Sequence, residues 1–269
     1  MFVRLDVGYD FLSISFLKSD VYQVFLILPS LSSITNTTEL KTAFSNLMRA
    51  DKTLIAAELT KTLSQVSISD ESLLGDLLHR LNKSYPGDVG CFVIYFLNRV
   101  LLSPGECMFL GANVPHAYLD GNCIECMACS DNVVRAGLTP KLIDVDTLVG
   151  MLEYVPSSAT ERKFKPKIDN FDKYVKEIYS PPVWDFAVTK YQGEGEIVVE
   201  KLDSSSVFLV TEGSCKVENV KVPEMSKFDE VSDLKKGGVC YMPKNVDGVK
   251  FTGCGDGFTV WRASANVFQ

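Results

Sequence analysis

Clusters of basic residues are missing from this sequence, and so are the most widespread catalytic motifs. Its 269 residues include 27 Lys and Arg against 34 Asp and Glu, which gives a formal net charge of −7. Without a basic stripe the chain is a poor candidate for nucleic-acid binding, because neutralising phosphates requires clustered cations. A Walker loop, a dinucleotide fingerprint and a Ser-His-Asp order are absent as well. A small phosphorylated substrate stays compatible with this composition, because one or two converging cations can bind it.

The sequence also lacks a long apolar run, and we do not expect its first residues to be a secretory leader. Its most apolar stretch, residues 11–31, is interrupted by Lys18 and Asp20, so neither part approaches the roughly 20 apolar residues of a membrane span. The first ten residues mix acidic and basic side chains, unlike the start of a signal peptide. We therefore expect a cytoplasmic monomer with reduced cysteines and without a membrane or nucleic-acid partner.

The composition changes several times along the chain. The first residues are rich in Phe, Leu, Ile, Val and Ser without a clear period, a helical pattern follows, and strand-like runs make up most of the rest. The predicted fold is mainly β with a helical insert (α+β). The expected parts are an atypical N-terminal segment (1–35), a helical insert (36–86), a β region (87–155), a linker (156–183) and a C-terminal β domain (184–269).

Capping residues and apolar stripes predict three helices in the insert. Asn36 and Glu39 have the spacing of a capping box, and Asp51 can cap a second helix. Ser69 or Asp70 can cap a third helix that carries a stripe of leucines.

Beyond the insert the pattern is mostly that of strands. CFVIYFLNRVLL, at 91–102, is continuously apolar and is interpreted as a buried strand with its flanks. CMFLGANVPHAYL, at 107–119, is interpreted as two short strands around a turn, and residues 144–154 as one more capped helix. The C-terminal domain is expected to contain strands in DFAVTKY, EIVVEKL, SVFLVTEG, SCKVENVKV, GGVCYMP, GVKFTG and FTVWRA.

Polar residues concentrate in PGECMFLGANVPHAYLDGNCIECMACSDNVVRAGLTPK, residues 104–141. Such a density inside strand-like sequence is costly unless the polar groups are paired, and a site is one way to pair them. His116 stands out because the chain has one other histidine, His79, which lies on an expected helix face. A lone histidine is more often a hydrogen-bonded structural residue than a metal ligand. Its place on a short strand nevertheless allows the His116 imidazole to point into a barrel.

Three charged residues in this segment have two interpretations each. Arg135 is either a surface residue paired with Asp131 or Asp144, or an anion clamp, because a guanidinium forks onto phosphate and stays charged. Lys141 is either solvated or a second positive charge for the same anion. Glu125 is a candidate metal carboxylate or a hydrogen-bond partner of the imidazole.

Cys123, Cys126 and Cys129 form a CxxCxxC pattern in the same segment. A structural zinc site takes four ligands, normally from two separated pairs, and no second pair with suitable spacing follows. We predict that the three cysteines form neither a disulfide nor a metal site and serve as small apolar residues.

The segment 104–141 resembles the signature of type I phosphomannose isomerases, which are zinc-dependent cupin enzymes. YPGDVGCFVIYFLN before it and YSPPVWDF after it are similar to the family too, and the resemblance runs from about residue 37 to the end. It implies an incomplete cupin or jelly-roll barrel followed by a second cupin-like β domain. The family's Gln-x-His pair and a further Glu, from an N-terminal cupin half, have no counterpart here.

The resemblance also implies an activity, the zinc-dependent interconversion of mannose 6-phosphate and fructose 6-phosphate by proton transfer between C1 and C2, which feeds GDP-mannose synthesis. His116 matches the family's C-terminal zinc ligand and Arg135 its catalytic arginine, so both are expected on one face of the barrel. The remaining matches, in or near the substrate pocket, are Tyr118, Glu125, Asp131 and Lys141. The implied cofactor is one zinc ion per complete site, with most of its ligands missing from this chain. The alternatives are a catalytically inactive truncated isomerase and a non-enzymatic cupin module.

Overall fold

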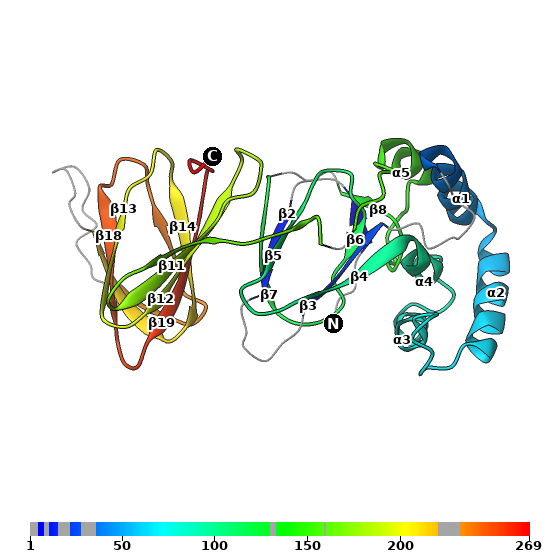
Figure 1. Ribbon diagram of the computed structural model, residues 1–269, viewed down its shortest axis with the longest axis horizontal. Coiled ribbons are helices and arrows are strands. Elements are labelled where there is room, and N and C mark those ends of the chain that lie inside the picture. The colour runs from blue at the N-terminus through cyan, green and yellow to red at the C-terminus, as the bar shows by residue number, and fades with distance from the viewer. Residues whose placement is uncertain are drawn as a thin grey trace. The chain divides into compact units, whose positions relative to one another are not determined.

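The structure, a computed structural model, describes residues 5–7, 11–15, 22–27, 36–129, 133–158, 160–219 and 232–269. The chain forms two compact units, Met1–Phe164 and Lys165–Gln269 (Figure 1). Both units contain sheets, strands outnumber helices over the described chain, and the described helices all belong to the first unit, so the predicted mainly β fold with a helical insert is confirmed. In the described part of the chain, no helix has the length and apolar character needed to cross a membrane.

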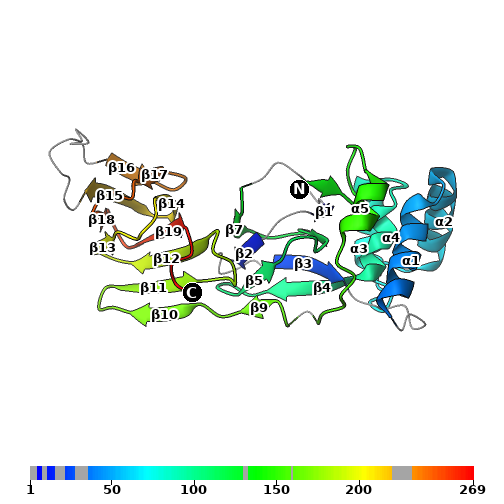
Figure 2. The same ribbon diagram turned by 90° about the horizontal axis from the view of Figure 1, so that it is seen from above.

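The helices of the first unit gather on one side of its strands (Figure 2). Three of them begin where their capping residues predict. Asn36 Oδ1 accepts a hydrogen bond from the Glu39 N–H at 3.0 Å, Asp51 accepts from the N–H groups two and three residues on, and Asp144 caps the last helix. The helices are α1 (Thr37–Arg49), α2 (Lys52–Gln65), α3 (Gly75–Ser84), α4 (Gly90–Val93) with the 3₁₀ turn η1 (Ile94–Phe96), and α5 (Val145–Met151).

The third helix starts later than predicted. Asp70 accepts a hydrogen bond from the Leu73 N–H, so it caps only an isolated turn. Leu74 then adopts a left-handed backbone with φ of 51°, and α3 begins at Gly75. A Cβ atom at Gly75 would collide with the carbonyl oxygen of Ser67, so only glycine fits where the two backbone segments touch. This close approach, which periodicity does not reveal, delays the start of the helix.

The apolar segment 91–102 is only partly a strand. Its first half is helical, in α4 and η1, and the strand β4 (Leu97–Leu102) follows. A continuous apolar run suits a buried helix as well as a buried strand. Here Cys91, Val93 and Phe96 pack into one core with the apolar faces of α1, α2 and α3, and this core decides the helical conformation.

The strands of the first unit pair across long stretches of sequence. One antiparallel sheet has the order β6-β1-β8, another the order β7-β2-β5-β9, and β3 pairs with β4. The segment 1–35, interpreted as atypical, therefore contributes a strand to each of these sheets in its described part. The strands are β1 (Leu5–Val7), β2 (Phe11–Ser15), β3 (Tyr22–Ile27), β4, β5 (Cys107–Leu110), β6 (His116–Ala117), β7 (Cys123–Met127), β8 (Val134–Arg135) and β9 (Lys163–Phe164).

The second unit is a stack of two antiparallel sheets with one core between them. The sheet orders are β10-β11-β12-β19-β14-β17 and β13-β18-β15-β16, and both sheets supply side chains to the core. Strands occur where the sequence predicts them from residue 184 on. The range 156–183, expected as a linker, differs from the prediction because it contains β9, β10 and β11. The strands are β10 (Lys167–Asn170), β11 (Tyr174–Tyr179), β12 (Ala187–Gly193), β13 (Glu196–Glu200), β14 (Ser206–Glu212), β15 (Ser214–Asn219), β16 (Ser232–Lys235), β17 (Val239–Met242), β18 (Gly248–Gly253) and β19 (Phe258–Ser264).

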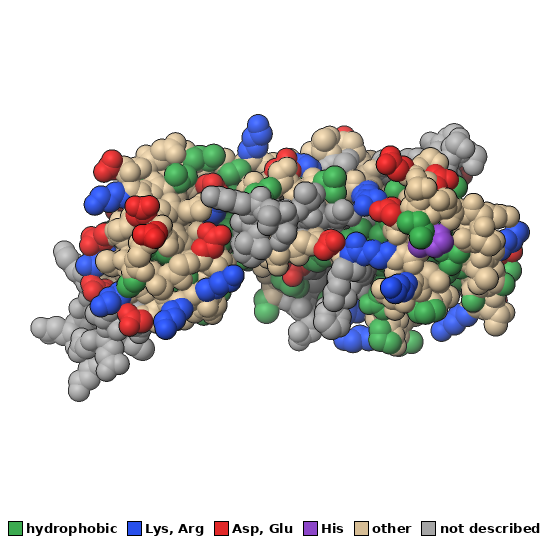
Figure 3. Space-filling view, turned by 90° about the horizontal axis from the view of Figure 1, so that it is seen from below, with side chains coloured by type: hydrophobic (Ala, Val, Ile, Leu, Met, Phe, Trp, Pro, Cys, Tyr) green, Lys and Arg blue, Asp and Glu red, His purple; other side chains and the backbone are tan. Residues whose placement is uncertain are grey.

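Charged side chains on the surface are mixed in sign. On the face drawn in Figure 3, Lys and Arg are interspersed with Asp and Glu, and no basic stripe forms. Several are paired, such as Arg99 with Asp76 at 3.0 Å and Lys201 with Asp247 at 2.8 Å.

Candidate functional site

The register of a three-stranded sheet brings His116 and Arg135 to one face. β1 lies between β6 and β8, and Asp6 of β1 is the Cα partner of both His116 and Arg135. Directly paired residues of antiparallel strands point to the same side, with Cα atoms about 4.5–5.5 Å apart. His116 and Arg135 therefore share a face, with their Cα atoms about 10 Å apart across one intervening strand, as the sequence comparison with the family led us to expect.

This shared face points away from the helices. Ala117 and Val134, which alternate with His116 and Arg135 along β6 and β8, pack on the helical core. Tyr118 follows two residues after His116 and packs on the opposite cluster, formed by strand residues. We call the side of this sheet that carries His116 and Arg135 the His–Arg face. Its neighbours are β-strands rather than the insert.

His116 is held in one tautomer by the backbone. Its side chain is buried, with 2% of the residue exposed, and Nδ1 lies 2.9 Å from the carbonyl oxygen of Val114. Because a carbonyl only accepts, Nδ1 carries the proton, and in the neutral ring the lone pair lies on Nε2. The Tyr118 ring lies 5.5 Å from the imidazole at an angle of 52°. The same arrangement, with Nδ1–H donated to a carbonyl, orients histidines that bind metals or exchange protons through Nε2.

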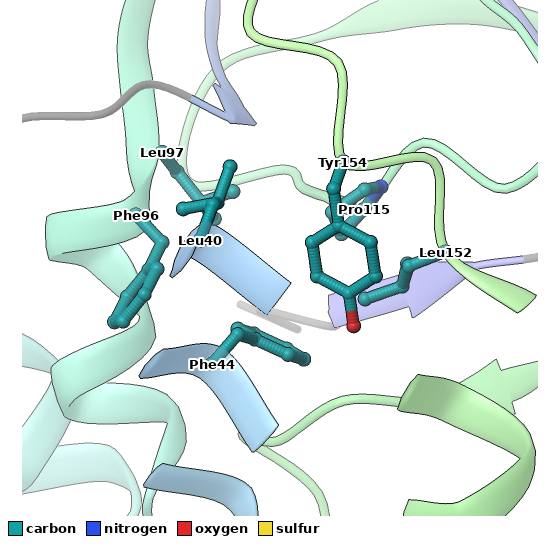
Figure 4. A pocket seen from close by; sticks show the side chains of 7 residues that line it. All are labelled: Leu40, Phe44, Phe96, Leu97, Pro115, Leu152 and Tyr154. Carbon is teal, nitrogen blue, oxygen red and sulfur yellow. The ribbon is translucent and has the colours of Figure 1, made fainter. Parts of the chain in front are cut away.

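A cluster of apolar side chains fixes the residue before His116. Pro115 lies against Leu40 and Phe44 of α1 and against Tyr154, as Figure 4 shows. The rings of Phe44 and Tyr154 meet edge-on, 6.2 Å apart at 65°, and burial raises the pKa of Tyr154 to about 12. The space left among these side chains is ≈ 10 Å³, which is too small for a ligand. The cluster therefore serves to position the strand that carries His116.

A carboxylate anchors the chain just after Arg135. Asp88 Oδ1 accepts hydrogen bonds from the N–H of Gly90, at 2.7 Å, and from the N–H of Leu138, at 2.8 Å. A Cβ atom at Gly137 would lie 2.7 Å from Gly90 Cα, so the two backbones touch. Sequence reasoning missed Asp88, which entered it only as one letter of the family-like segment YPGDVGCFVIYFLN. The available signal was an acidic residue following Pro-Gly and preceding an apolar helix.

The other expected site residues are not all brought to this face. Glu125 is exposed on β7, where the register through Ser13 puts it on the same side as the buried Met108. Lys141 is exposed and lines a groove of ≈ 930 Å³ between the 139–145 loop and the helical insert. Asp131 lies outside the described residues.

The described residues do not form a zinc site. They contain no group of three or more His, Cys, Asp or Glu side chains that could hold a metal ion. Catalytic zinc takes three protein ligands, so the zinc implied by the resemblance does not fit the donors seen here. Register also separates two of the three cysteines, because Cys123 and Cys126 lie on opposite faces of β7. Burial raises the pKa of Cys126 to about 11, which disfavours the thiolate that a metal would need.

Comparisons with known proteins agree on one family. A family model described as "Phosphomannose isomerase type I, helical insertion domain" matches residues 23–97, and one described as "Phosphomannose isomerase type I C-terminal" matches residues 177–218. The mannose-6-phosphate isomerase of Macaca fascicularis is 46% identical over 215 residues, 77% of this chain and 49% of that protein. The chain belongs to the type I phosphomannose isomerase family. Its likeness reaches back to residue 23, further than the residue 37 expected from the resemblance.

Other members of the phosphomannose isomerase family are similar to comparable degrees. Mannose-6-phosphate isomerase of Homo sapiens is 45% identical over 77% of this chain and 49% of its own length, and a probable mannose-6-phosphate isomerase of Dictyostelium discoideum is 38% identical over 77% and 46%. A crystal structure of a point mutant of phosphomannose isomerase from Salmonella typhimurium matches with a TM-score of 0.76 and 25% identity, over 96% of this chain and 68% of that one. The cupin-type fold with a helical insert is thereby confirmed, and in the described residues its sheets do not close into a barrel. The chain spans about half the length of the curated relatives it matches.

Proposed function

We propose that the chain carries the His116–Arg135 part of a mannose-6-phosphate isomerase site, which interconverts mannose 6-phosphate and fructose 6-phosphate. The observation that supports this most is the common face on which β1 holds the two residues. Relatives at 45–46% identity bear the name of that enzyme. In the family, the product would serve GDP-mannose synthesis, and the same is proposed here. A cytoplasmic location and a monomeric state stay predictions.

The chemistry proposed for Arg135 is electrostatic. Moving a proton between C1 and C2 of the sugar passes through a negatively charged enediolate, and a fixed guanidinium stabilises such charge where it develops. Arg135 is half-buried at the end of a strand whose following loop is tied to Asp88, so its backbone is held in place. Because arginine keeps its proton at any physiological pH, it serves as a charge and not as the base.

His116 is proposed to act through Nε2. Its Nδ1 proton is engaged by the Val114 carbonyl, so the ring presents the lone pair of Nε2 and keeps a fixed orientation. The described residues supply no further ligands that would complete a zinc site with it. No step through a metal is therefore assigned to this chain.

A second candidate function follows from that missing ligand set. A chain with an arginine for the phosphate or enediolate, but without three metal ligands, would bind the sugar phosphate without turning it over. This is the inactive truncated isomerase that the sequence already suggests as an alternative.

Binding and turnover measured side by side on the purified chain test both candidates. Calorimetric titration with mannose 6-phosphate should show binding that Arg135→Gln weakens about tenfold or more, the loss expected for a charged hydrogen bond. Arg99→Gln is the matched control, because Arg99 lies in the same unit and pairs with Asp76 on the surface. Equal affinities for the wild type and Arg135→Gln would refute the site.

A coupled isomerase assay with added zinc then separates the candidates. Turnover that His116→Ala abolishes would establish the isomerase in this chain and exclude the inactive form. Binding without turnover would establish the inactive form. Because His116 is buried, circular dichroism of His116→Ala must match the wild type for the comparison to count.

A further inference from the structure

The second unit holds a buried arginine that the proposed isomerase site does not use. Arg262 is 3% exposed and lies on β19, where its register partners are Thr189 of β12 and Phe208 of β14. Both partners are buried, and paired residues share a face, so the Arg262 side chain points toward the core between the two sheets. Burying a cation costs free energy unless partners replace its hydration. Its contacts therefore decide what the residue can do.

The described contacts of Arg262 are with neutral groups. Nε donates to Ser206 Oγ at 2.8 Å, Nη1 donates to the backbone carbonyl of Glu200 at 3.1 Å, and the Phe208 ring centroid lies 5.6 Å from the guanidinium carbon. Nη2 is buried and makes no hydrogen bond of acceptable geometry within the described chain. Tyr191 lies nearby: burial raises the pKa of its hydroxyl, and the charge of Arg262 and a hydrogen bond between the two side chains oppose that rise. The orphaned donor is therefore Nη2 alone. The guanidinium thus keeps one donor without an acceptor.

A pocket of ≈ 360 Å³ lies beside this guanidinium, and Arg262 is part of its lining. Its volume is in the range of small-molecule sites. Phe171 and Tyr174 form an aromatic wall, with ring centroids 4.4 Å apart and planes at 12°. Lys176, the register partner of Tyr191, brings a second positive charge to the same side. Lys201 lines the pocket as well, but it pairs with Asp247 at 2.8 Å. Several cations and an aromatic wall are the features of a site for an organic anion.

Two carboxylates limit which anion fits. Asp169 lies 3.9 Å from Lys176 Nζ, and Glu200 also lines the pocket. Burial raises the pKa of Tyr174, and the negative charge of Glu200 adds to the rise, so Glu200 is close enough to repel a diffuse polyanion. A compact anionic group that reaches Arg262 directly is favoured.

We propose that Arg262 binds the phosphate or carboxylate group of a small ligand in this pocket, which gives the second unit a binding site of its own. A guanidinium makes forked, charge-assisted hydrogen bonds to either group. The bound oxygen would supply the acceptor that Nη2 lacks. The site lies in a different unit from the His–Arg face and does not depend on the proposed isomerase activity.

Calorimetric titrations of the full chain with inorganic phosphate and with acetate, at constant ionic strength, test the site. Because the His–Arg face is also expected to bind phosphate under the proposed function, the titrations use an Arg135→Gln background. Saturable binding of at least one anion is expected, and adding Arg262→Gln should weaken it about ten- to a hundredfold. Binding of phosphate but not acetate assigns the site to phosphate esters, and the reverse assigns it to carboxylates. No saturable binding, or equal affinity with and without Arg262, overturns the proposal.

A pair of lysine variants keeps the test decisive if Arg262→Gln does not fold. Lys176 lines the pocket, whereas Lys190, one residue before Tyr191 on β12, points to the other face of the sheet and lies 5.8 Å from the Trp261 ring centroid. Changing either lysine to Gln removes one positive charge, and the two lysines lie on the neighbouring strands β11 and β12. Lys176→Gln should weaken anion binding severalfold and Lys190→Gln should leave it unchanged. Equal effects of the two changes overturn the proposal.

Discussion

Asp88 should contribute a large share of the stability of the first unit. One carboxylate oxygen accepts two backbone hydrogen bonds, from Gly90 and from Leu138, and both of these residues are buried. Hydrogen bonds to charged groups contribute about 1.5–3 kcal/mol each, so Asp88→Ala should lower the free energy of unfolding by about 3 kcal/mol or more. Asp88→Asn keeps an oxygen acceptor without the charge and should cost about half as much.

Urea unfolding followed by circular dichroism in the helical band measures this effect, because the described helices all lie in the first unit. Asp146→Ala is the control, since Asp146 is 83% exposed at its side chain and its pairing with Arg49 is a surface ion pair, which contributes about 1 kcal/mol or less. The reasoning fails if Asp88→Ala stays within about 1 kcal/mol of the wild type, or if both alanine variants cost the same.

Three further predictions concern single residues. In the same urea-unfolding experiment, Gly137→Ala should destabilise the chain by about 2 kcal/mol or more, because the φ of Gly137 is 144° and the new Cβ would meet the backbone of a neighbouring segment. Gly150→Ala is the control: a Cβ there would meet open space, so this change should be neutral or stabilising. Burial raises the pKa of the Cys107 thiol to about 12, so the thiol stays protonated at about pH 8. Iodoacetamide should therefore label the exposed Cys129 before Cys107, which peptide mass spectrometry can follow over time. Early modification of Cys107 would contradict this prediction. The pKa of Asp51 is lowered, first by a hydrogen bond from the Thr53 hydroxyl and then by those from the Thr53 and Leu54 N–H groups. The stability that ionised Asp51 contributes is therefore full above the unfolded pKa of about 3.9 and is lost as pH falls through the lower folded pKa. Asp51→Asn should therefore lose less stability than the wild type on acidification below about pH 4, and equal losses in urea unfolding would refute the cap as the cause.

Local chemistry made much of the secondary structure predictable. Asn36, Asp51 and Asp144 begin helices because their side chains accept the first free N–H groups, and that effect needs only neighbouring residues. The strands after residue 184 were equally visible, since turn residues separate apolar runs at regular spacing. Effects that act within a few residues can be recognised from one sequence.

Effects between distant segments were not predictable in this way. The close approach of Gly75 to Ser67 and the helical conformation of 91–96 depend on partners that no local pattern specifies. The pairing of β1 with β6 and β8 was also missed, because a strand of three residues has no period to detect. The candidate site divides in the same manner. His116 and Arg135 were found from a family signature, whereas Asp88 acts through two contacts, one of them far away in the sequence.

The central position of β1 has a consequence for the order of folding. Val7 pairs with Val134 and Leu5 with Ala117, so the sheet that carries the His–Arg face closes a loop of most of the first unit. Such long-range pairing costs chain entropy before any contact repays it, and it slows folding. During synthesis β1 has no partner in this sheet until β6 has left the ribosome, and the sheet is complete only after β8 has followed. The helical insert, whose contacts are more local, can form earlier. The two residues proposed for chemistry would then meet among the last events in the folding of their unit, and any partner that occupied β1 beforehand would keep them apart.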